Sequence, residues 1–175
     1  MRLVKNLIYK YRIRKDPVAF FRRLGATIGN DCEIYPSVNI TEPYLVSIGN
    51  AVRINEGVHL IGHDGGVWCL RHLYPDLKDI DKFGKITIGN NVHIGTNAII
   101  MPNVKIGDNC IIGCGAIVTK MIPSNSVAVG VPARVIESID DYRKKNINSF
   151  VHTKKMKNSE KRKYLIDSMG VNKNV

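Results

Sequence analysis

The chain has 175 residues, of which 44% are hydrophobic, 7% aromatic and 23% charged. This length fits one domain, and the apolar content is sufficient for a buried core, which excludes an intrinsically disordered chain. No apolar run approaches the roughly 18 residues that a transmembrane helix needs, and charges interrupt Met1–Arg14 too often for a signal peptide. We therefore expect a folded, cytoplasmic protein.

The net charge of +11 is concentrated at the two ends of the chain. Residues 1–24 hold eight Lys or Arg against one acid, residues 25–136 hold eight against nine, and residues 137–175 hold ten against five. A basic protein is a candidate for binding nucleic acid, but neither flank interleaves aromatic residues with its cations as a stacking platform does. We expect no nucleic-acid partner, and at most a weak association of the basic flanks with a membrane surface.

The first flank, residues 1–24, predicts a basic helical cap. Between Arg2 and Lys15, cations alternate with apolar residues at a helical period, and Pro17 then interrupts the pattern. We expect this helix to cover one end of the domain with its basic face in solvent. Residues 137–175 are expected to form a helical segment and a basic tail at the other end.

A six-residue repeat occupies the middle of the chain, residues 25–136. Nine hexapeptides open with Ile, and the position four residues later always holds a small or β-branched apolar residue. The openings are Ile28, Ile34, Ile48, Ile54, Ile88, Ile94, Ile100, Ile106 and Ile112. A period of six excludes a helix face, and the Gly that follows six of these Ile residues marks turns. Three short extended segments would close one triangular coil, and stacked coils pair as parallel sheets, so we predict an all-β solenoid.

The repeat is interrupted twice. Two extra residues lie around 41–47, and twenty-two residues are inserted between Leu60 and Ile88, which gives a loop over residues 63–85. A long loop on a rigid scaffold is where binding and catalytic residues concentrate.

The four cysteines show no C-x-x-C spacing, so we expect neither a metal site nor disulfides. Cys32 and Cys110 fall at inward-facing positions of the repeat and are expected in the core.

The second half of the repeat, ITIGNNVHIGTNAIIMPNVKIGDNCIIGCGAIVTK, resembles the hexapeptide-repeat acyltransferases, in particular galactoside, maltose and polysaccharide O-acetyltransferases. The resemblance implies a left-handed parallel β-helix of hexapeptide repeats with short flanking α-helices at both ends. The handedness comes from the resemblance and not from the period. The resemblance also implies acetyl-CoA as the acyl donor and a homotrimer whose active sites lie between subunits.

The reaction that the resemblance implies is transfer of an acetyl group from a thioester to a hydroxyl or an amine. A hydroxyl needs a base to remove its proton as it attacks, and a neutral imidazole suits that task. In the family a single His at the mouth of the projecting loop is the base, and the matching residue is His63. The alternative for His63 is a turn histidine bonded to the backbone. Asp64 would orient the imidazole or position the acceptor, and its alternative is a turn carboxylate that caps the loop.

The resemblance places the cofactor on the second half of the repeat. Thr96 and Cys114 match positions whose backbone groups bind the pantetheine arm. Thr119, Lys120 and Arg134 match positions near the adenosine and phosphate end, where cations suit the phosphates of CoA. Cys114 is not expected to carry the acetyl group, because no basic residue adjoins it in sequence to stabilise a thiolate.

The loop over residues 63–85 is expected to select the acceptor. Trp68, the only tryptophan, lies there with Arg71 and His72. An indole can stack on a sugar ring, and it can equally fasten the loop to a neighbouring subunit. Because the loop resembles those of acetyltransferases of bacterial surface-polysaccharide synthesis, we predict an O-acetyltransferase acting on a sugar hydroxyl. The alternatives are an N-acetyltransferase for a nucleotide-linked amino sugar, and a β-helix subunit without catalysis.

Overall fold

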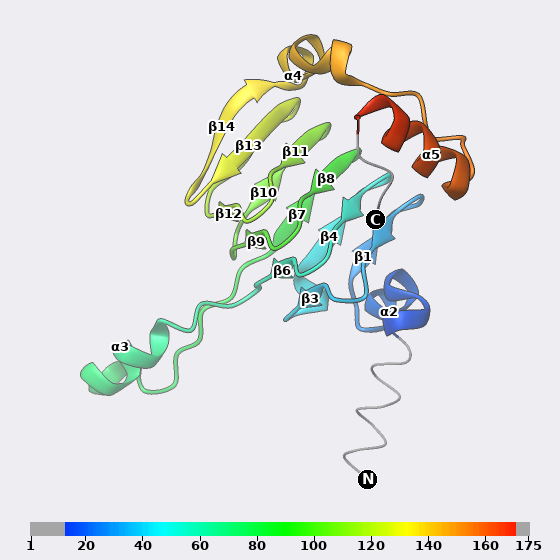
Figure 1. Cartoon of the computed structure of the whole chain (residues 1–175). Helices are drawn as coiled ribbons and strands as arrows, with labels where there is room; N and C mark the ends of the chain where they lie inside the picture. The colour runs from blue at the N-terminus through cyan, green and yellow to red at the C-terminus, as the bar shows by residue number, and fades with distance from the viewer. Residues whose placement is uncertain (1–12, 171–175) are drawn as a thin grey trace. The chain divides into compact units, whose positions relative to one another are not determined.

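The structure is a computed structural model that describes residues 13–170. The chain divides into two compact units, Met1–Tyr142 and Arg143–Val175. The first unit is built from three sheets of short strands, with a long loop that leaves the coils and carries a small helix (Figure 1). Within the described range, no helix has both the length and the apolar content to cross a membrane.

Successive strands visit the three sheets in turn, so that each coil adds one strand to each sheet. The first sheet holds β1 (Thr27–Ile28), β4 (Val46–Ile48), β7 (Ile86–Ile88) and β10 (Lys105–Ile106). The second holds β2 (Glu33–Ile34), β5 (Arg53–Ile54), β8 (Val92–Ile94), β11 (Cys110–Ile112), β13 (Ser126–Gly130) and β14 (Ala133–Ser138). The third holds β3 (Asn39–Ile40), β6 (His59–Leu60), β9 (Ile99–Ile100) and β12 (Ile117–Val118). These pairings are parallel except for the β13–β14 hairpin, which confirms the predicted parallel solenoid.

The register of the coils follows the repeat. In the second sheet, Ile54 pairs with Ile94, which pairs with Ile112. The long insertion leaves this stacking intact, because β4 still pairs with β7 through Ile48 and Ile88. The backbone N–H groups of one coil therefore bond to the carbonyl groups of the next coil, as when Gly49 N–H donates to Ile88 O over 2.9 Å.

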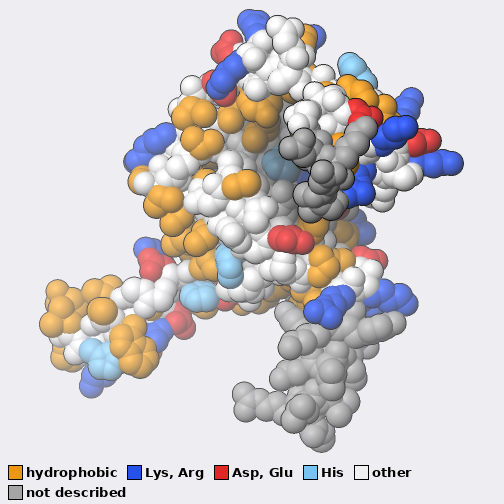
Figure 2. Space-filling model, in the orientation of Figure 1, with side chains coloured by type: hydrophobic (Ala, Val, Ile, Leu, Met, Phe, Trp, Pro, Cys, Tyr) orange, Lys and Arg blue, Asp and Glu red, His pale blue; other side chains and the backbone are white. Residues whose placement is uncertain are grey.

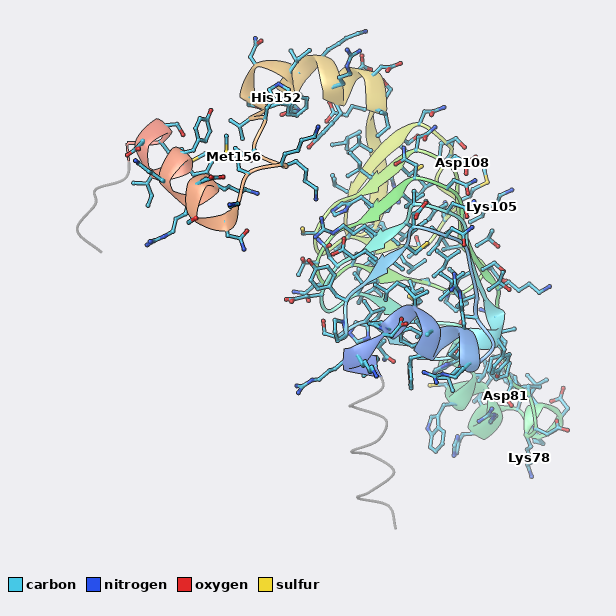
Figure 3. The ribbon with its side chains drawn as sticks, turned by 90° about the vertical axis from the view of Figure 1, so that its right-hand side faces the viewer. Lys78, Asp81, Lys105, Asp108, His152 and Met156 are labelled. Atoms are coloured by element: carbon cyan, nitrogen blue, oxygen red, sulfur yellow. The ribbon has the colours of Figure 1, made fainter. Side chains whose placement is uncertain are left out.

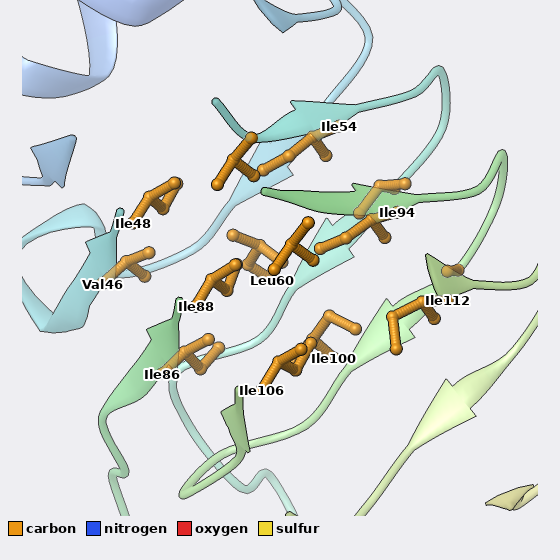
Figure 4. Close-up of a cluster of buried hydrophobic side chains, with 14 of the residues drawn as sticks. Val46, Ile48, Ile54, Leu60, Ile86, Ile88, Ile94, Ile100, Ile106 and Ile112 are labelled. Carbon is orange, nitrogen blue, oxygen red and sulfur yellow. The ribbon is translucent and has the colours of Figure 1, made fainter. Parts of the chain in front are cut away.

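The isoleucines that open the repeats fill the interior of the solenoid (Figure 4). Ile54, Ile94 and Ile100 are 0% exposed, and each such side chain stabilises the fold by roughly 1.5–3 kcal/mol relative to exposure. Cys110 is buried, which confirms its predicted core position, while Cys32 is half-buried and packs against the edge of the core.

One corner of each coil, between the first and second sheets, has a left-handed backbone. Asp31, Ala51, Asn91, Asn109 and Asn125 have φ angles from 53° to 61°. Asn tolerates this conformation better than most residues because its side chain bonds locally. The amides also stack along the solenoid: Asn91 Nδ2 donates to Asn109 Oδ1 (2.9 Å), and Asn109 Nδ2 donates to Asn125 Oδ1 (2.8 Å). Ala51 has no amide with which to extend this column.

Helix α2 (Pro17–Arg23) packs at the start of the solenoid. Phe20 and Phe21 are buried, and the Arg22 guanidinium donates to Ile28 O and Gly29 O, carbonyl groups of the first coil. Most of the predicted basic helix between Arg2 and Lys15 lies outside the described residues.

After the last coil come the β13–β14 hairpin and α4 (Ile139–Asn146). The second unit contains the short helical turn η3 (Ile147–Ser149) and α5 (Asn158–Ser168), at whose start Lys157 N–H donates to Glu160 Oε2 over 3.0 Å.

Candidate active site

The inserted loop begins and ends as a short antiparallel ribbon. Its contacts are Gly84 N–H to Gly62 O (2.9 Å), Asp64 N–H to Lys82 O (2.8 Å) and a β-bridge between His63 and Phe83. Beyond the ribbon, α3 (Val67–Leu73) and the helical turn η2 (Pro75–Leu77) lie away from the coils (Figure 1). The ribbon therefore fixes the backbone of His63 at the point where the loop leaves the solenoid, where the sequence predicts it.

His63 is paired with a carboxylate. Its Nδ1 atom lies 2.8 Å from Glu42 Oε1. An ionised carboxylate only accepts hydrogen bonds, so a neutral imidazole in this contact carries its proton on Nδ1 and keeps the lone pair on Nε2. The His63 side chain is 44% exposed and that of Glu42 only 13%, so the imidazole is accessible while its partner is nearly buried. A carboxylate bonded to one nitrogen of an accessible imidazole leaves the other nitrogen to accept a proton.

Glu42 comes from the other interruption of the repeat, just before the helical turn η1 (Pro43–Leu45). The Thr41 hydroxyl donates to Glu42 Oε2, and the same hydroxyl accepts from Gly62 N–H over 2.9 Å. Gly62 leaves room for the carboxylate, because a Cβ atom there would lie 2.6 Å from Glu42 Oε2. Both carboxylate oxygens are thus engaged, and the coil next to His63 holds Glu42 in place.

Asp64 has different partners. Its carboxylate accepts from Lys82 Nζ (2.7 Å) and from Gly66 N–H (2.9 Å). These hydrogen bonds, chiefly the one from Lys82, hold the pKa of Asp64 below its ordinary value. Glu42, and not Asp64, makes the bond to His63 that orients the imidazole. Asp64 instead joins the two ends of the loop, as a turn carboxylate does.

A cavity of about 360 Å³ opens beside His63. Of the residues predicted for the site, His63, Asp64, Trp68 and Arg71 line it. The Arg71 side chain spans the loop: Nε donates to Ile80 O over 2.7 Å, and Nη2 donates to the Asp81 carboxylate.

His72, predicted to contact the acceptor, is not among the residues that line the cavity beside His63. Its Nδ1 atom lies 2.8 Å from Trp68 O, and its ring centroid lies 4.8 Å from that of Trp68. Together with Trp68, Cys69 and Leu73 it lines a separate hollow on α3. Figure 2 shows that hydrophobic side chains gather over this helix.

Lys78 and Asp81 lie in the loop, away from Lys105 and Asp108 on the coils (Figure 3). Among residues 13–170, no group of three or more His, Cys, Asp or Glu is placed to hold a metal ion.

The predicted cofactor residues lie on the later coils. Thr96 and Cys114 occupy the corner between the second and third sheets in adjacent coils, where Gly115 N–H donates to Thr96 O over 2.8 Å. Thr119 and Lys120 are exposed and follow β12. Arg134, also exposed, lies on β14. None of the five lines the cavity beside His63, so a single chain keeps them apart from the imidazole.

Comparison with known proteins identifies the family. Residues 85–120 match the family described as bacterial transferase hexapeptide (six repeats). The chain is 43% identical to protein CapG of Staphylococcus aureus over 173 residues, which are 97% of this chain and 99% of that protein. It is 42% identical to the galactoside O-acetyltransferase of Escherichia coli (strain K12) over 135 residues, which are 72% of this chain and 61% of that protein. The chain belongs to the hexapeptide-repeat acetyltransferases.

A solved member of this family supports the fold as well as the sequence relation. The structure of a galactoside acetyltransferase in complex with coenzyme A matches with a TM-score of 0.51 and 29% identity, covering 81% of this chain and 82% of that one. The fold of this hexapeptide-repeat acetyltransferase is the left-handed parallel β-helix with flanking α-helices, as predicted.

Sequence reasoning missed Glu42 and Phe83, and also the two charged residues that pair with predicted ones, Asp81 with Arg71 and Lys82 with Asp64. A signal for Glu42 was present, because Asn39 aligns with His59 in the next coil and the same offset places Glu42 beside Gly62. Phe83 carries no comparable signal, because the loop has no repeat from which its pairing with His63 follows.

Proposed function

We propose that this acetyltransferase moves the acetyl group of acetyl-CoA to a hydroxyl group of a sugar, with His63 as the general base. The observation that carries the proposal is the 2.8 Å contact between His63 Nδ1 and Glu42, which leaves Nε2 to accept a proton. This arrangement favours catalysis over the alternative of a turn histidine bonded to the backbone.

In the proposed reaction the acceptor hydroxyl attacks the thioester carbonyl while His63 Nε2 takes the hydroxyl proton. The resulting imidazolium is stabilised by Glu42 through a charge-assisted hydrogen bond. When the tetrahedral intermediate collapses, the C–S bond breaks, the imidazolium returns its proton to the departing CoA thiolate, and the acetyl ester is released. No acetyl-enzyme is formed.

We propose that the donor lies along Thr96 and Cys114, with its phosphates near Lys120 and Arg134. Within one chain these residues lie apart from the cavity at His63. A homotrimer, in which the later coils of one subunit face the loop of the next, would bring them to one site, and we propose this assembly.

The relation to a galactoside O-acetyltransferase supports a sugar hydroxyl as the acceptor. The resemblance of the loop to those of surface-polysaccharide acetyltransferases supports a role in the synthesis of such a polysaccharide.

The experiment is an acceptor screen with labelled acetyl-CoA, using free sugars, nucleotide-linked amino sugars and lipid-linked saccharides. In His63→Ala, turnover with the best acceptor should fall by about 10²–10⁴-fold while the acetyl-CoA Kd stays unchanged. His152→Ala, which alters a histidine of the second unit, is the matched control and should retain wild-type turnover. Near-normal turnover in His63→Ala would contradict the proposal, and transfer only to amines would replace the hydroxyl with an amino group.

A further inference from the structure

Phe83 is an exposed aromatic residue on the wall of the cavity beside His63. Its side chain is among the exposed large hydrophobic groups, at 51%. Its ring centroid lies 6.5 Å from that of His63, with the two planes inclined at 67°. About half of Phe83 thus stays exposed in the single chain, and exposed apolar area costs roughly 25 cal/mol per Å² relative to burial. A ligand that covers the ring would recover that energy.

The position of Phe83 relative to the base is fixed by the backbone. Phe83 and His63 form the β-bridge of the ribbon, and Gly84 N–H bonds to Gly62 O immediately beside it. Phe83 therefore sits at a defined distance from the imidazole, on a paired segment and not on the open part of the loop. Binding groups held in this way position a ligand with little loss of conformational entropy.

The charges on the cavity wall are paired with one another. Arg71 is bonded to Asp81, and Lys82 is bonded to Asp64. The remaining acid, Glu42, is bonded to His63. Acids outnumber the two fixed cations among the residues that line the cavity, so a carboxylate or phosphate group placed there would meet a neutral to negative surface.

We propose that Phe83 is the platform on which the acceptor ring lies, and that this platform takes an uncharged saccharide ring. The apolar C–H face of the ring would cover Phe83 and bring one hydroxyl to His63 Nε2. The proposal rests on the proposed function and deepens it, since it names the group that positions the acceptor and the charge class that the cavity accepts.

The first test measures the KM of the best neutral acceptor in Phe83→Ala and Phe83→Leu. We expect KM to rise by about tenfold in both variants, because neither presents a flat ring, while Phe83→Tyr stays near wild type. The acetyl-CoA Kd should not change. Phe150→Ala, which alters a similarly exposed Phe (49%) of the second unit, is the matched control. Melting curves establish that each variant is folded.

The second readout is the slow hydrolysis of acetyl-CoA without acceptor, which needs the base but not the platform. At acceptor concentrations below KM, Phe83→Ala should lower transfer about tenfold more than it lowers hydrolysis, whereas His63→Ala should lower both reactions to the same extent. Equal loss of hydrolysis and transfer in Phe83→Ala would mean that Phe83 acts only through His63, and an unchanged acceptor KM would mean that the ring does not bind there. Either result overturns the proposal while leaving the base assignment to be judged by His63→Ala.

The charge class is tested with a matched pair of probes, methyl β-galactopyranoside and the corresponding uronic acid. The neutral probe should have a kcat/KM at least tenfold higher than the acid. Preference for the uronic acid would overturn the assignment to an uncharged ring.

Discussion

The substitution Glu42→Gln removes the negative charge beside His63 and keeps the size of the side chain. At Glu42 the carboxylate is nearly buried, and both of its oxygens have hydrogen-bond partners. The Thr41 hydroxyl, which accepts from Gly62 N–H and donates to Glu42 Oε2, would hold the amide oxygen of the new side chain in the place of Oε2. The amide N–H₂ then donates to Nδ1, which moves the imidazole proton onto Nε2 and removes the lone pair that the proposed reaction uses. The folded structure should survive, because the Thr41 hydroxyl can bond to an amide as well as to a carboxylate.

The expected loss follows from the bond to the imidazolium. A hydrogen bond to a charged group contributes about 1.5–3 kcal/mol, which is roughly 10- to 150-fold in rate when the charge is present only in the transition state. Reversal of the tautomer would extend the loss toward about 10⁴-fold. We therefore expect kcat of Glu42→Gln to lie at least tenfold below wild type.

The assay is steady-state transfer to the best acceptor with both substrates saturating, together with the acetyl-CoA Kd from calorimetry. The Kd should stay unchanged, because Glu42 lies apart from the residues proposed to bind the donor. Glu33→Gln, the same substitution at an exposed carboxylate of the second sheet, should have a wild-type kcat. A Glu42→Gln enzyme with kcat within threefold of wild type would refute the assignment of Glu42 as the residue that holds His63.

Three further predictions concern the solenoid. Ala51→Asn should raise the free energy of unfolding by about 1 kcal/mol and Tm by about 2–4 °C. The reason is that Asn tolerates the left-handed backbone and can bond to Asn91. A melting curve that shows no rise in Tm would contradict this. Cys114 and Cys69 are both exposed, and coenzyme A should slow the alkylation of Cys114 alone, as peptide mapping will show; equal protection of both would argue against the proposed donor site. Burial, with a further contribution from Arg53, lowers the pKa of His93. Below about pH 6.5 the unfolded chain then binds more protons than the folded one, so the free energy of unfolding falls as the pH is lowered. His93→Gln should therefore flatten the decline of Tm between pH 6.5 and 5. An unchanged slope of Tm against pH would contradict this.

The coils were predictable because the sequence of each repeat indicates its local backbone conformation. An Ile such as Ile54 or Ile94 recurs at one phase, and the parallel stacking of coils places it in the core without any long-range information. The first and last residues of the loop were predictable because the six-residue period breaks there. The same break indicates His63, which is the first residue of the loop.

The partners of His63 were less accessible to sequence reasoning. Glu42 lies 21 residues from His63 in sequence, and the two residues meet only because of the register of two neighbouring coils. Asp64, which is adjacent to His63 in sequence, bonds to Lys82 instead. Inside the loop, no period indicates which side of α3 faces the cavity. The sequence therefore assigns both Trp68 and His72 to the acceptor, although only Trp68 lines the cavity beside His63.

The proposed role of His63 as the base depends on which of its ring nitrogens carries the proton. A two-bond ¹H–¹⁵N correlation spectrum of protein labelled with ring-¹⁵N histidine, assigned by comparison with His63→Ala, reports which nitrogen carries the proton. At pH 7.5 we expect a proton on Nδ1 and none on Nε2, and we expect this signature to be lost in Glu42→Gln. A His63 ring protonated on Nε2, or one whose tautomer is the same in Glu42→Gln, would rule out His63 as a base held by Glu42.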